Sequence, residues 1–171
     1  MRLEPVSAEH QQIFQSWYQI DRLEAHTCRP VMSGKRILQN HQVTTWVFLI
    51  EELAEPVGKF AFFDLNPRNR SAEFGYTINP EFRKQGMGTK MLNLAIDRLF
   101  LAEDSNPENI DLHKLYCQTG AFNLASVRLL EKLGFHRDGI LREHHELDGK
   151  LWDDYIYSLL RREWQSLRSQ L

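Results

Sequence analysis

A short segment from Arg83 to Thr89 combines cationic side chains with two glycines. It reads Arg-Lys-Gln-Gly-Met-Gly-Thr and stands between a strand-like stretch and a helical one. Glycines at 86 and 88 allow the backbone to approach a ligand, and the N–H groups at a helix start, together with the helix dipole, favour an anion. A pyrophosphate fits this chemistry. The alternative is a tight strand-to-helix turn that binds nothing.

Spacing excludes two common phosphate-binding motifs for this segment. A Walker loop needs Gly-Lys followed by Ser or Thr after four spacer residues, and a dinucleotide fingerprint needs a third glycine at position 91. Position 91 is methionine, and the lysine at 90 follows Thr89. The pattern that remains is R/Q-x-x-G-x-G/A.

The elements on either side of the segment would position it. Apolar and polar residues alternate from Ala72 to Ile78, which predicts a strand with Glu73 and Thr77 on one face. Beyond the segment, apolar residues at helical spacing predict a helix. Its apolar stripe consists of Leu92, Ala95, Ile96 and Leu99.

The N-terminal part of the chain predicts a strand followed by helices. Ser7 begins a capping segment for a helix that carries apolar and aromatic residues. Two runs rich in β-branched and aromatic residues, 44–50 and 57–65, predict a hairpin of central strands, and a turn follows at 66–69. The residues expected on the helix are Ile13, Phe14, Trp17 and Ile20.

The C-terminal part predicts a polar loop over 103–111, a strand over 114–119 and a helix over 123–133. Gly134 is a suitable C-terminal cap for that helix. Asp148 and Gly149 stand between two strand-like runs and predict a hairpin turn.

Composition narrows the class of protein. A chain of 171 residues is long enough for one compact domain, predicted here to span 1–171. A formal net charge of −2 argues against nucleic acid as the main partner. The sequence shows neither a signal peptide nor a run of about 18 apolar residues, so we expect a cytoplasmic protein without a membrane partner. Cys28 and Cys117 lack a CxxC pair, which argues against a disulfide framework or a zinc site.

The glycine segment resembles the pyrophosphate motif of the GNAT acetyltransferases. A second segment further along resembles that family's second motif, in which an asparagine opens a helix that ends in a Leu-Gly-Phe turn; here these are Asn123, Ser126 and 133–135. The resemblance covers nearly the whole chain, from the strand at Glu73 to Trp164. It is strongest to the ribosomal-protein N-terminal (RimJ/RimL-like) acetyltransferase branch, and spermidine acetyltransferases look similar in the same regions.

The resemblance implies an α/β GNAT fold. Its twisted mixed sheet would have six or seven strands flanked by helices, with a splay where the strand at 71–78 parts from the strand at 114–119. It also implies acetyl-CoA as the co-substrate, with the acyl chain entering the splay, and no metal. The implied cofactor contacts are Ile78, Arg83, Lys84, Gln85, Gly86, Met87, Gly88, Thr89 and Asn123.

The same resemblance implies catalytic roles. Glu73 is the expected base for the attacking amine, and a backbone N–H near Ile78 would stabilise the oxyanion. Many relatives protonate the departing thiolate with a tyrosine where this chain has Leu130, so Ser126, one turn earlier, is the proposed partner. The alternatives are a solvated strand face for Glu73, a small core residue for Ser126 and a plain helix N-cap for Asn123.

The tract from Glu143 to Glu146 contains two adjacent histidines. Alternation on a strand sends neighbouring side chains to opposite faces, which argues against a metal site there. We expect His144, His145 and Asp154 to line the acceptor cleft, because the final hairpin borders that cleft in relatives; surface hairpin residues are the alternative.

The acceptor is expected to be a primary amine, most readily the α-amine of a protein such as a ribosomal protein. A polyamine, amino sugar or antibiotic is the enzymatic alternative. A CoA-binding sensor without turnover is the alternative from another class, because Leu130 replaces the tyrosine. The chain is expected to act as a monomer or homodimer.

Overall fold

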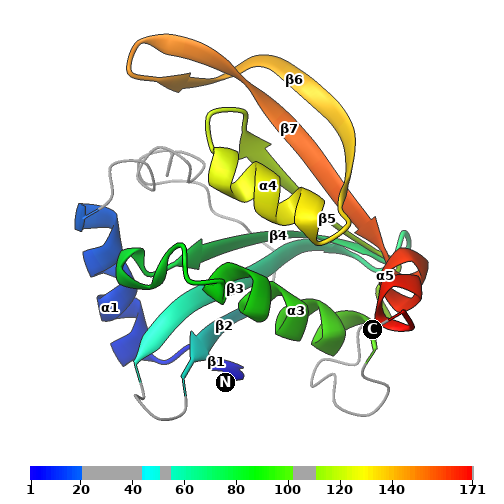
Figure 1. The fold of residues 1–171 in the computed structure, drawn as a ribbon, viewed down its shortest axis with the longest axis horizontal. Coiled ribbons are helices and arrows are strands. Elements are labelled where there is room, and N and C mark those ends of the chain that lie inside the picture. Colours follow the sequence, from blue (N-terminus) through cyan, green and yellow to red (C-terminus); the bar gives the residue numbers. More distant parts are fainter. Residues whose placement is uncertain (21–43, 51–54, 102–110, 171) are drawn as a thin grey trace. The chain divides into compact units, whose positions relative to one another are not determined.

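The computed structural model describes residues 1–20, 44–50, 55–101 and 111–170. The second helix expected near the N-terminus, Cys28 and most of the loop predicted at 103–111 lie outside these residues. Seven strands form one sheet in the order β1-β2-β3-β4-β5-β7-β6, which confirms the predicted mixed α/β fold (Figure 1). The strands are β1 (Arg2–Pro5), β2 (Thr44–Leu49), β3 (Pro56–Asn66), β4 (Ser71–Ile78), β5 (Lys114–Gly120), β6 (His136–Leu147) and β7 (Lys150–Leu160).

The helices are α1 (Ala8–Ile20), the short 3-10 helix η1 (Pro80–Phe82), α3 (Met87–Phe100), α4 (Leu124–Lys132) and α5 (Arg161–Arg168). Helices α1, α3 and α4 follow the predicted order, whereas η1 and α5 were not predicted. By its internal packing the chain divides into two compact units, which are described one at a time. Unit 1 comprises residues 1–63 and 75–95, and unit 2 comprises 64–74 and 96–171.

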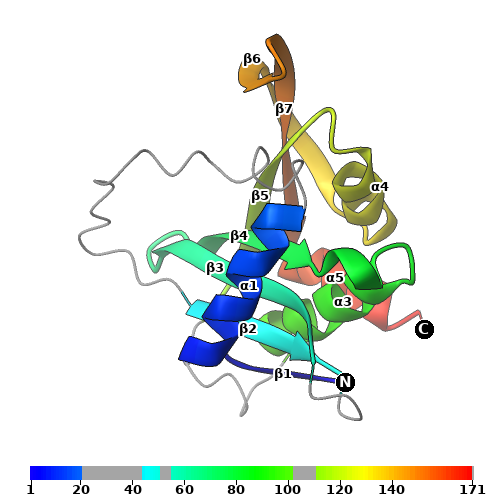
Figure 2. The ribbon, with the colours of Figure 1, turned by 90° about the vertical axis from the view of Figure 1, so that its left-hand side faces the viewer.

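In unit 1, helix α1 lies across β2 and β3 (Figure 2). Its N-terminus is fixed as the sequence predicted: the Ser7 hydroxyl accepts the backbone N–H of His10 at 3.3 Å, and His10 Nδ1 accepts that of Ser7 at 3.1 Å. Phe14 and Trp17 are buried, while Ile13 on the same helix is exposed. These two aromatic residues form a small core with Val6, Val47 and Leu49.

The predicted hairpin of β2 and β3 is confirmed by antiparallel pairing from Thr44 opposite Phe62 to Leu49 opposite Pro56. Trp46 lies between Phe60 and Phe62, with ring centroids 5.8 and 5.4 Å away. These aromatic contacts fill the interior of the unit, because all three side chains are almost fully buried.

Unit 2 is built on a parallel pairing of β4 with β5 and an antiparallel pairing of β5 with β7. The parallel pairing covers Ser71 to Glu73, and Glu73 opposite Tyr116 is its last pair. The predicted splay of the two strands beyond that pair stays a prediction. Strands β6 and β7 form a long twisted antiparallel hairpin, drawn in yellow to orange in Figure 1.

The hairpin turn has the conformation that its sequence predicts. Asp148 and Gly149 have φ of 52° and 75°, as the two central residues of a type I′ turn require, and Leu147 pairs with Lys150 across it. Strand β6 is less regular than the sequence suggests. Its register shifts between Leu141 and His145, where Glu143 has a φ of 51°.

Helix α4 ends in a Schellman motif built on Gly134. The N–H of Phe135 donates to Leu130 O at 3.0 Å, and that of Gly134, with a φ of 83°, donates to Glu131 O at 3.1 Å. The helix lies beside β5 and β7 (Figure 1), and Tyr157 donates its hydroxyl to Glu131 at 2.9 Å. Burial and this hydrogen bond raise the pKa of Tyr157 to about 12.

Helix α5 was not predicted: its sequence is mostly charged and polar, and its two apolar residues, Trp164 and Leu167, stand three positions apart. Its N-terminus is held by Glu163, whose carboxylate accepts the backbone N–H of Leu160 at 2.9 Å. Trp164 is its one buried residue. No helix in the described residues is long and apolar enough to cross a membrane.

Candidate functional site

The glycine segment forms the loop between η1 and α3 in unit 1. Lys84 and Gly86 both take the left-handed conformation, with φ of 59° and 77°. Helix α3 begins at Met87, and its first bond runs from the N–H of Lys90 to Gly86 O at 3.1 Å. The N–H groups before Lys90 therefore have no acceptor within the helix, which is the arrangement that binds an anion.

Two side chains of this loop stabilise its conformation by donating hydrogen bonds to nearby backbone carbonyls. Arg83 Nε donates to Ile78 O at 3.0 Å, and Gln85 Nε2 donates to Glu81 O at 2.9 Å. A Cβ added to Gly86 would meet nothing within 4 Å, so the space in front of this residue is open. The loop therefore fits a pyrophosphate bound by backbone N–H groups. Gln85 would contribute its backbone more readily than its side chain.

The strand end before the loop is also fixed by hydrogen bonds. The N–H of Asn79 donates to Val57 O at 2.9 Å, so it cannot serve as the oxyanion donor predicted near Ile78. Asn79 is buried, and its side chain accepts the N–H of Glu81 at 3.1 Å. Sequence reasoning missed Asn79, although an Asn-Pro pair is a common start of a helical turn.

Glu73 lies in unit 2 and is only 6% exposed, so the interpretation as a solvated strand-face residue is wrong. It belongs to β4, which has strands on both sides, and its neighbours Ala72 and Phe74 are buried as well. Burial raises the pKa of the Cys117 thiol well above its usual range, and the negative charge of Glu73 adds to this effect. A thiol held protonated is consistent with the packing role expected for Cys117.

Asn123 and Ser126 meet at the start of α4. The Asn123 side chain accepts the backbone N–H of Ser126 at 3.2 Å, so the interpretation of Asn123 as a helix N-cap is confirmed. Ser126 is half-buried and Leu130 is fully buried on the same helix. The cofactor contact of Asn123 and the thiolate contact of Ser126 stay predictions.

The three residues expected at the acceptor side separate into two groups. His145 and Asp154 come together, with His145 Nδ1 at 3.6 Å from Asp154 Oδ2. His144 is exposed. Asp154 is 3% exposed, which makes the interpretation as a surface hairpin residue wrong for Asp154.

Two residues that sequence reasoning missed complete this cluster. Gln118 Nε2 on β5 donates to Asp154 Oδ2 at 2.6 Å. Phe122 contacts the rings of His145 and Trp152 edge-on, with centroids 5.1 and 5.8 Å away. Gln118 reaches Asp154 because β5 pairs with β7, a long-range register that alternation along one strand does not reveal.

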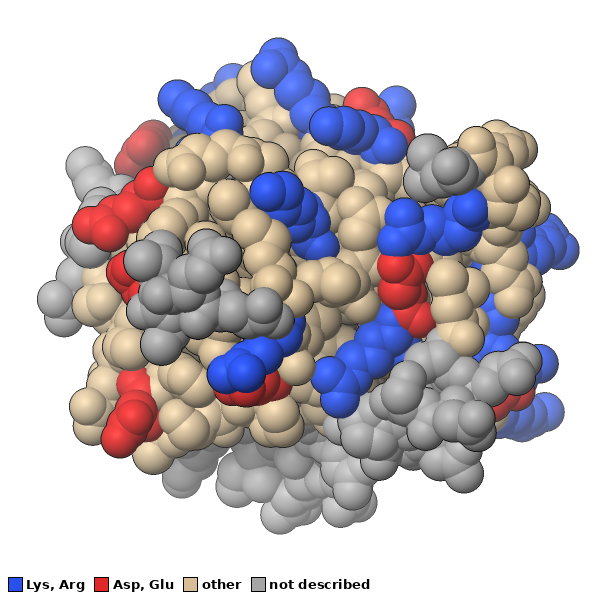
Figure 3. Space-filling model, turned by 60° about the horizontal axis from the view of Figure 1, so that its bottom comes forward, with Lys and Arg blue, Asp and Glu red and all other residues tan. Residues whose placement is uncertain are grey.

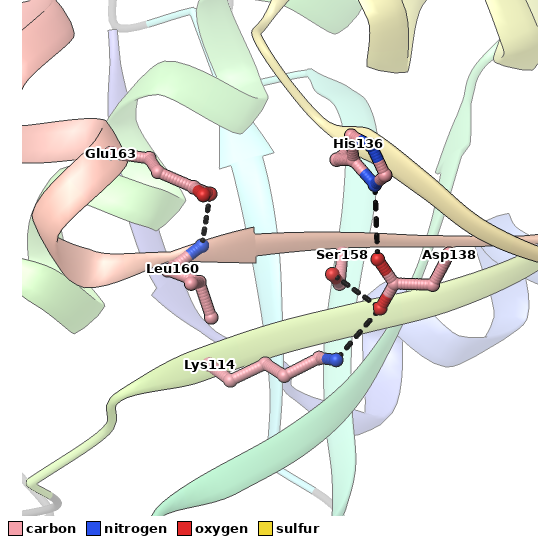
Figure 4. A network of polar contacts seen from close by, with 6 residues as sticks. All are labelled: Lys114, His136, Asp138, Ser158, Leu160 and Glu163. Atoms are coloured by element: carbon pink, nitrogen blue, oxygen red, sulfur yellow. Dashed lines mark hydrogen bonds and ion pairs between the residues drawn. The ribbon is translucent and has the colours of Figure 1, made fainter.

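Asp138 forms a second polar cluster in unit 2 (Figure 4). Its carboxylate accepts from Lys114 Nζ at 2.8 Å and from the Ser158 hydroxyl at 2.7 Å, and lies 3.2 Å from His136 Nδ1. The hydrogen bond from Lys114, aided by those from Ser158 and His136, lowers the pKa of Asp138 to about 2. This cluster joins β5, β6 and β7 and serves as a structural anchor.

The surface that Figure 3 shows carries charged side chains of both signs. Figure 3 shows Lys and Arg side chains scattered over one face, with Asp and Glu side chains between them. In the part of the chain that the structure describes, no group of three or more His, Cys, Asp or Glu side chains is placed to hold a metal ion.

Comparison with known proteins places these features in a family. Residues 1–136 match the model of the "Acetyltransferase (GNAT) domain". An uncharacterized N-acetyltransferase p20 of Bacillus licheniformis is 27% identical over 72% of this chain and 65% of its own length. A spermidine N(1)-acetyltransferase of Vibrio cholerae is 30% identical over 62% of this chain and 58% of its own length.

A third relative, the putative ribosomal N-acetyltransferase YdaF of Bacillus subtilis, is 31% identical over 63% of this chain and 55% of its own length. The matches thus span less than two thirds of these three relatives. Among solved structures, a spermidine N-acetyltransferase of Vibrio cholerae in complex with CoA and spermine superposes with a TM-score of 0.80. That match covers 96% of this chain and 97% of the other at 21% identity, a likeness of fold.

Proposed function

Since the chain belongs to the GNAT acetyltransferase family, we propose that it transfers the acetyl group of acetyl-CoA to a primary amine. The observation that carries this proposal is the loop before α3, where the left-handed Gly86 leaves open space beside N–H groups that lack helical acceptors. GNAT acetyltransferases draw the acetyl group from acetyl-CoA, whose pyrophosphate these N–H groups would bind.

The residues that would hold acetyl-CoA are those of the loop and the strand end before it. The backbone of 84–89 would bind the phosphates, and Lys84, which is exposed, would add a positive charge. The contact of Arg83 with Ile78 O would keep the loop in place without the ligand. Pre-organisation of this kind lowers the entropy lost on binding.

Glu73 and Ser126 are proposed for the proton transfers. Glu73 is 6% exposed, so its carboxylate is largely shielded from bulk water. Ser126 would protonate the departing thiolate, a role for which its half-buried place in the first turn of α4 leaves it accessible. Tyr157 is not a substitute for the missing tyrosine at 130, since its hydroxyl is already donated to Glu131.

We propose the α-amine of a protein N-terminus as the acceptor. An α-amine has a pKa near 8, whereas a lysine-like amine has one near 10, so an α-amine needs less help to lose its proton at neutral pH. Among the described residues expected to line the acceptor cleft, Asp154 is a buried carboxylate. The relative named as a putative ribosomal N-acetyltransferase supports this acceptor and the corresponding branch of the family.

A polyamine is the second candidate acceptor. Two relatives of similar identity are named spermidine N(1)-acetyltransferases, from Vibrio cholerae and Escherichia coli. A polyamine carries several positive charges and would be expected to require several acidic side chains around it. This candidate predicts a strong preference for spermidine over a peptide of equal concentration.

The test is a thiol-release assay with acetyl-CoA and a panel of N-terminal peptides, polyamines, amino sugars and aminoglycosides. Turnover that depends on a peptide, and is lost in Gly86→Asp, supports the principal proposal. Faster turnover with spermidine moves the assignment to the polyamine. Binding of acetyl-CoA without turnover of any amine contradicts an enzymatic role and favours a CoA-binding sensor.

A further inference from the structure

The residue that follows β4, Asn79, is fixed to the first residues of β3 within unit 1. Its backbone N–H donates to Val57 O at 2.9 Å, and its side-chain Nδ2 donates to Pro56 O at 3.4 Å. Asn79 is 5% exposed, and Pro56 and Val57 are buried as well. Breaking these bonds would leave buried polar groups without partners, so the end of β4 is held in one place.

The same side chain starts η1. Asn79 Oδ1 accepts the backbone N–H of Glu81 at 3.1 Å, and Pro80, which has no N–H to satisfy, occupies the first position of the helix. The backbone carbonyl of Asn79 also accepts the N–H of Phe82 at 2.9 Å. Asn79 therefore links β3 to the turn that leads into the glycine segment.

Two side chains of the glycine segment are bound to this turn. Arg83 Nε donates to Ile78 O at 3.0 Å, and Gln85 Nε2 donates to Glu81 O at 2.9 Å. Ile78 directly precedes Asn79, and Glu81 is the residue whose N–H Asn79 accepts. The conformation of the segment therefore depends on Asn79 through two hydrogen bonds.

The helix after the segment packs against β3 at Gly58. A Cβ at this position would lie 2.7 Å from Met91 Sδ on α3, 2.9 Å from Ile78 Cδ1 and 3.0 Å from Thr77 O. The first turns of α3 and the end of β4 thus approach the β3 backbone more closely than a larger residue at 58 would allow. Both ends of the glycine segment are therefore positioned by the first three residues of β3.

We propose that Asn79 and Gly58 are positioning residues for the phosphates of acetyl-CoA. This inference rests on the proposed function, in which the backbone N–H groups of 84–89 bind those phosphates. Neither residue has to touch the ligand: Asn79 fixes the turn before the segment, and Gly58 fixes where α3 begins. N–H groups that are held in place beforehand lose less entropy when the ligand binds.

The test measures binding of CoA to the 171-residue chain by calorimetry, and amide hydrogen exchange over 84–90 without ligand. In Asn79→Ala we expect Kd to rise about tenfold, because the segment would spend most of its time in conformations that do not bind. Exchange at these amides should become faster for the same reason. The matched control is Asn66→Ala. Asn66 Oδ1 likewise accepts one backbone N–H, that of Asn69 at 2.9 Å, and its loss should leave Kd unchanged.

Asn79→Ser separates positioning from packing. Serine keeps an acceptor for the N–H of Glu81 but is too short to reach Pro56, so it should recover most of the lost affinity. In Asn79→Ala the KM for acetyl-CoA should rise while kcat at saturation is kept, since only binding is weakened. A purely structural role would lower the melting temperature and leave Kd, KM and the exchange of 84–90 as in wild type. A serine variant as weak as the alanine variant would contradict the role of the bond to Glu81.

Gly58→Ala tests the other end of the segment. The added methyl group would displace Met91 or the end of β4, and we expect Kd for CoA to rise about tenfold while the melting temperature shows that the chain is folded. Gly139→Ala is the matched control, because Gly139 also lies on a strand and a Cβ there would meet nothing within 4 Å. It should bind CoA as wild type does.

The outcomes separate this inference from the function on which it rests. If the wild-type chain binds no CoA, the proposed function falls and the positioning roles fall with it. If the wild-type chain binds CoA, and folded Asn79→Ala and Gly58→Ala bind it as tightly as their controls, the function stands and the positioning roles are wrong.

Discussion

Trp164 donates its indole N–H to Asp97 at 2.8 Å, and this bond ties the C-terminal helix α5 to the end of α3 within unit 2. Arg168, one turn further along α5, donates Nε to the same carboxylate at 2.9 Å and makes a second contact through its other guanidinium nitrogen. The bond from Arg168 raises the pKa of this arginine, which is therefore charged at all relevant pH values.

Replacing Asp97 by alanine should destabilise the chain. The Trp164 side chain is 2% exposed, so its N–H would be left without an acceptor, at about 1–3 kcal/mol in the free energy of unfolding. Urea denaturation measures this loss. Asp97→Asn keeps an acceptor oxygen and should lose less, and an Asp97→Ala variant as stable as wild type would show that the bond contributes nothing.

Gly134→Ala should destabilise for two separable reasons. The residue has a φ of 83°, and an added Cβ would lie 2.6 Å from Leu167 Cδ1. We expect a loss of about 1–3 kcal/mol in the free energy of unfolding. Gly149, with a φ of 75° and nothing within 4 Å of its Cβ position, offers the matched control for the backbone effect alone. In a Leu167→Ala background the steric part of the loss should disappear, and a loss of equal size in both backgrounds would contradict the contact.

The Asp138 cluster predicts a specific loss of stability in acid. Its pKa is lowered from 3.8 to about 2 in the folded chain, so the unfolded chain binds a proton at higher pH than the folded one. The stabilisation is therefore complete above about pH 4 and is lost as the pH falls from 4 to 2. Because the carboxylate is 35% exposed, solvent screening limits its size to about 1 kcal/mol.

Comparison of wild type with Asp138→Asn checks this prediction. The wild-type chain should be more stable near neutral pH, and the difference in the free energy of unfolding should shrink as the pH approaches 2. A difference that stays constant over this range would mean that the charge of Asp138 is not the stabilising feature.

Gly86→Asp should weaken binding of CoA while leaving the fold intact. Aspartate tolerates a positive φ better than most residues, and a carboxylate at a helix N-terminus is favourable, so the variant should melt near the wild-type temperature. The same carboxylate would repel the phosphates, and we expect Kd to rise about tenfold or more. Gly86→Asn has the same shape without the charge, and calorimetry should find its Kd closer to that of wild type. Equal affinities in the two variants would argue against phosphates at this loop.

Ser126→Ala should lower kcat and kcat/KM and retain the N-cap bond of α4. The hydroxyl is half-buried, and the N-cap bond that Ser126 donates comes from its backbone, which alanine retains. A thiolate left without a proton donor should slow the reaction most for acceptors that attack readily, because thiolate departure then limits the rate. Unchanged kinetics would leave Ser126 as a packing residue of α4.

Local sequence signals predicted most of the elements, because those signals act over a few residues. Three features depend on neighbours one turn or less away. They are the apolar stripe of α3, the N-terminal and C-terminal caps of α4 at Asn123 and Gly134, and the turn at Asp148 and Gly149. Helix α5 was missed because it is stabilised by a distant partner, Asp97. Its own sequence is mostly charged and polar, with Trp164 and Leu167 as its apolar residues.

The features of the candidate site also fall into those that the local sequence determines and those that only the tertiary structure decides. The sequence by itself determined the glycine loop before α3, because a left-handed glycine at the start of a helix is a local requirement of the backbone. Only the tertiary structure decided that Glu73 is buried, and that Gln118, His145 and Asp154 form one cluster. The reason is physical: these three side chains meet through the registers of β5 with β7 and of β6 with β7. Such registers depend on pairing between distant strands and on a local irregularity in β6 that alternation cannot reveal.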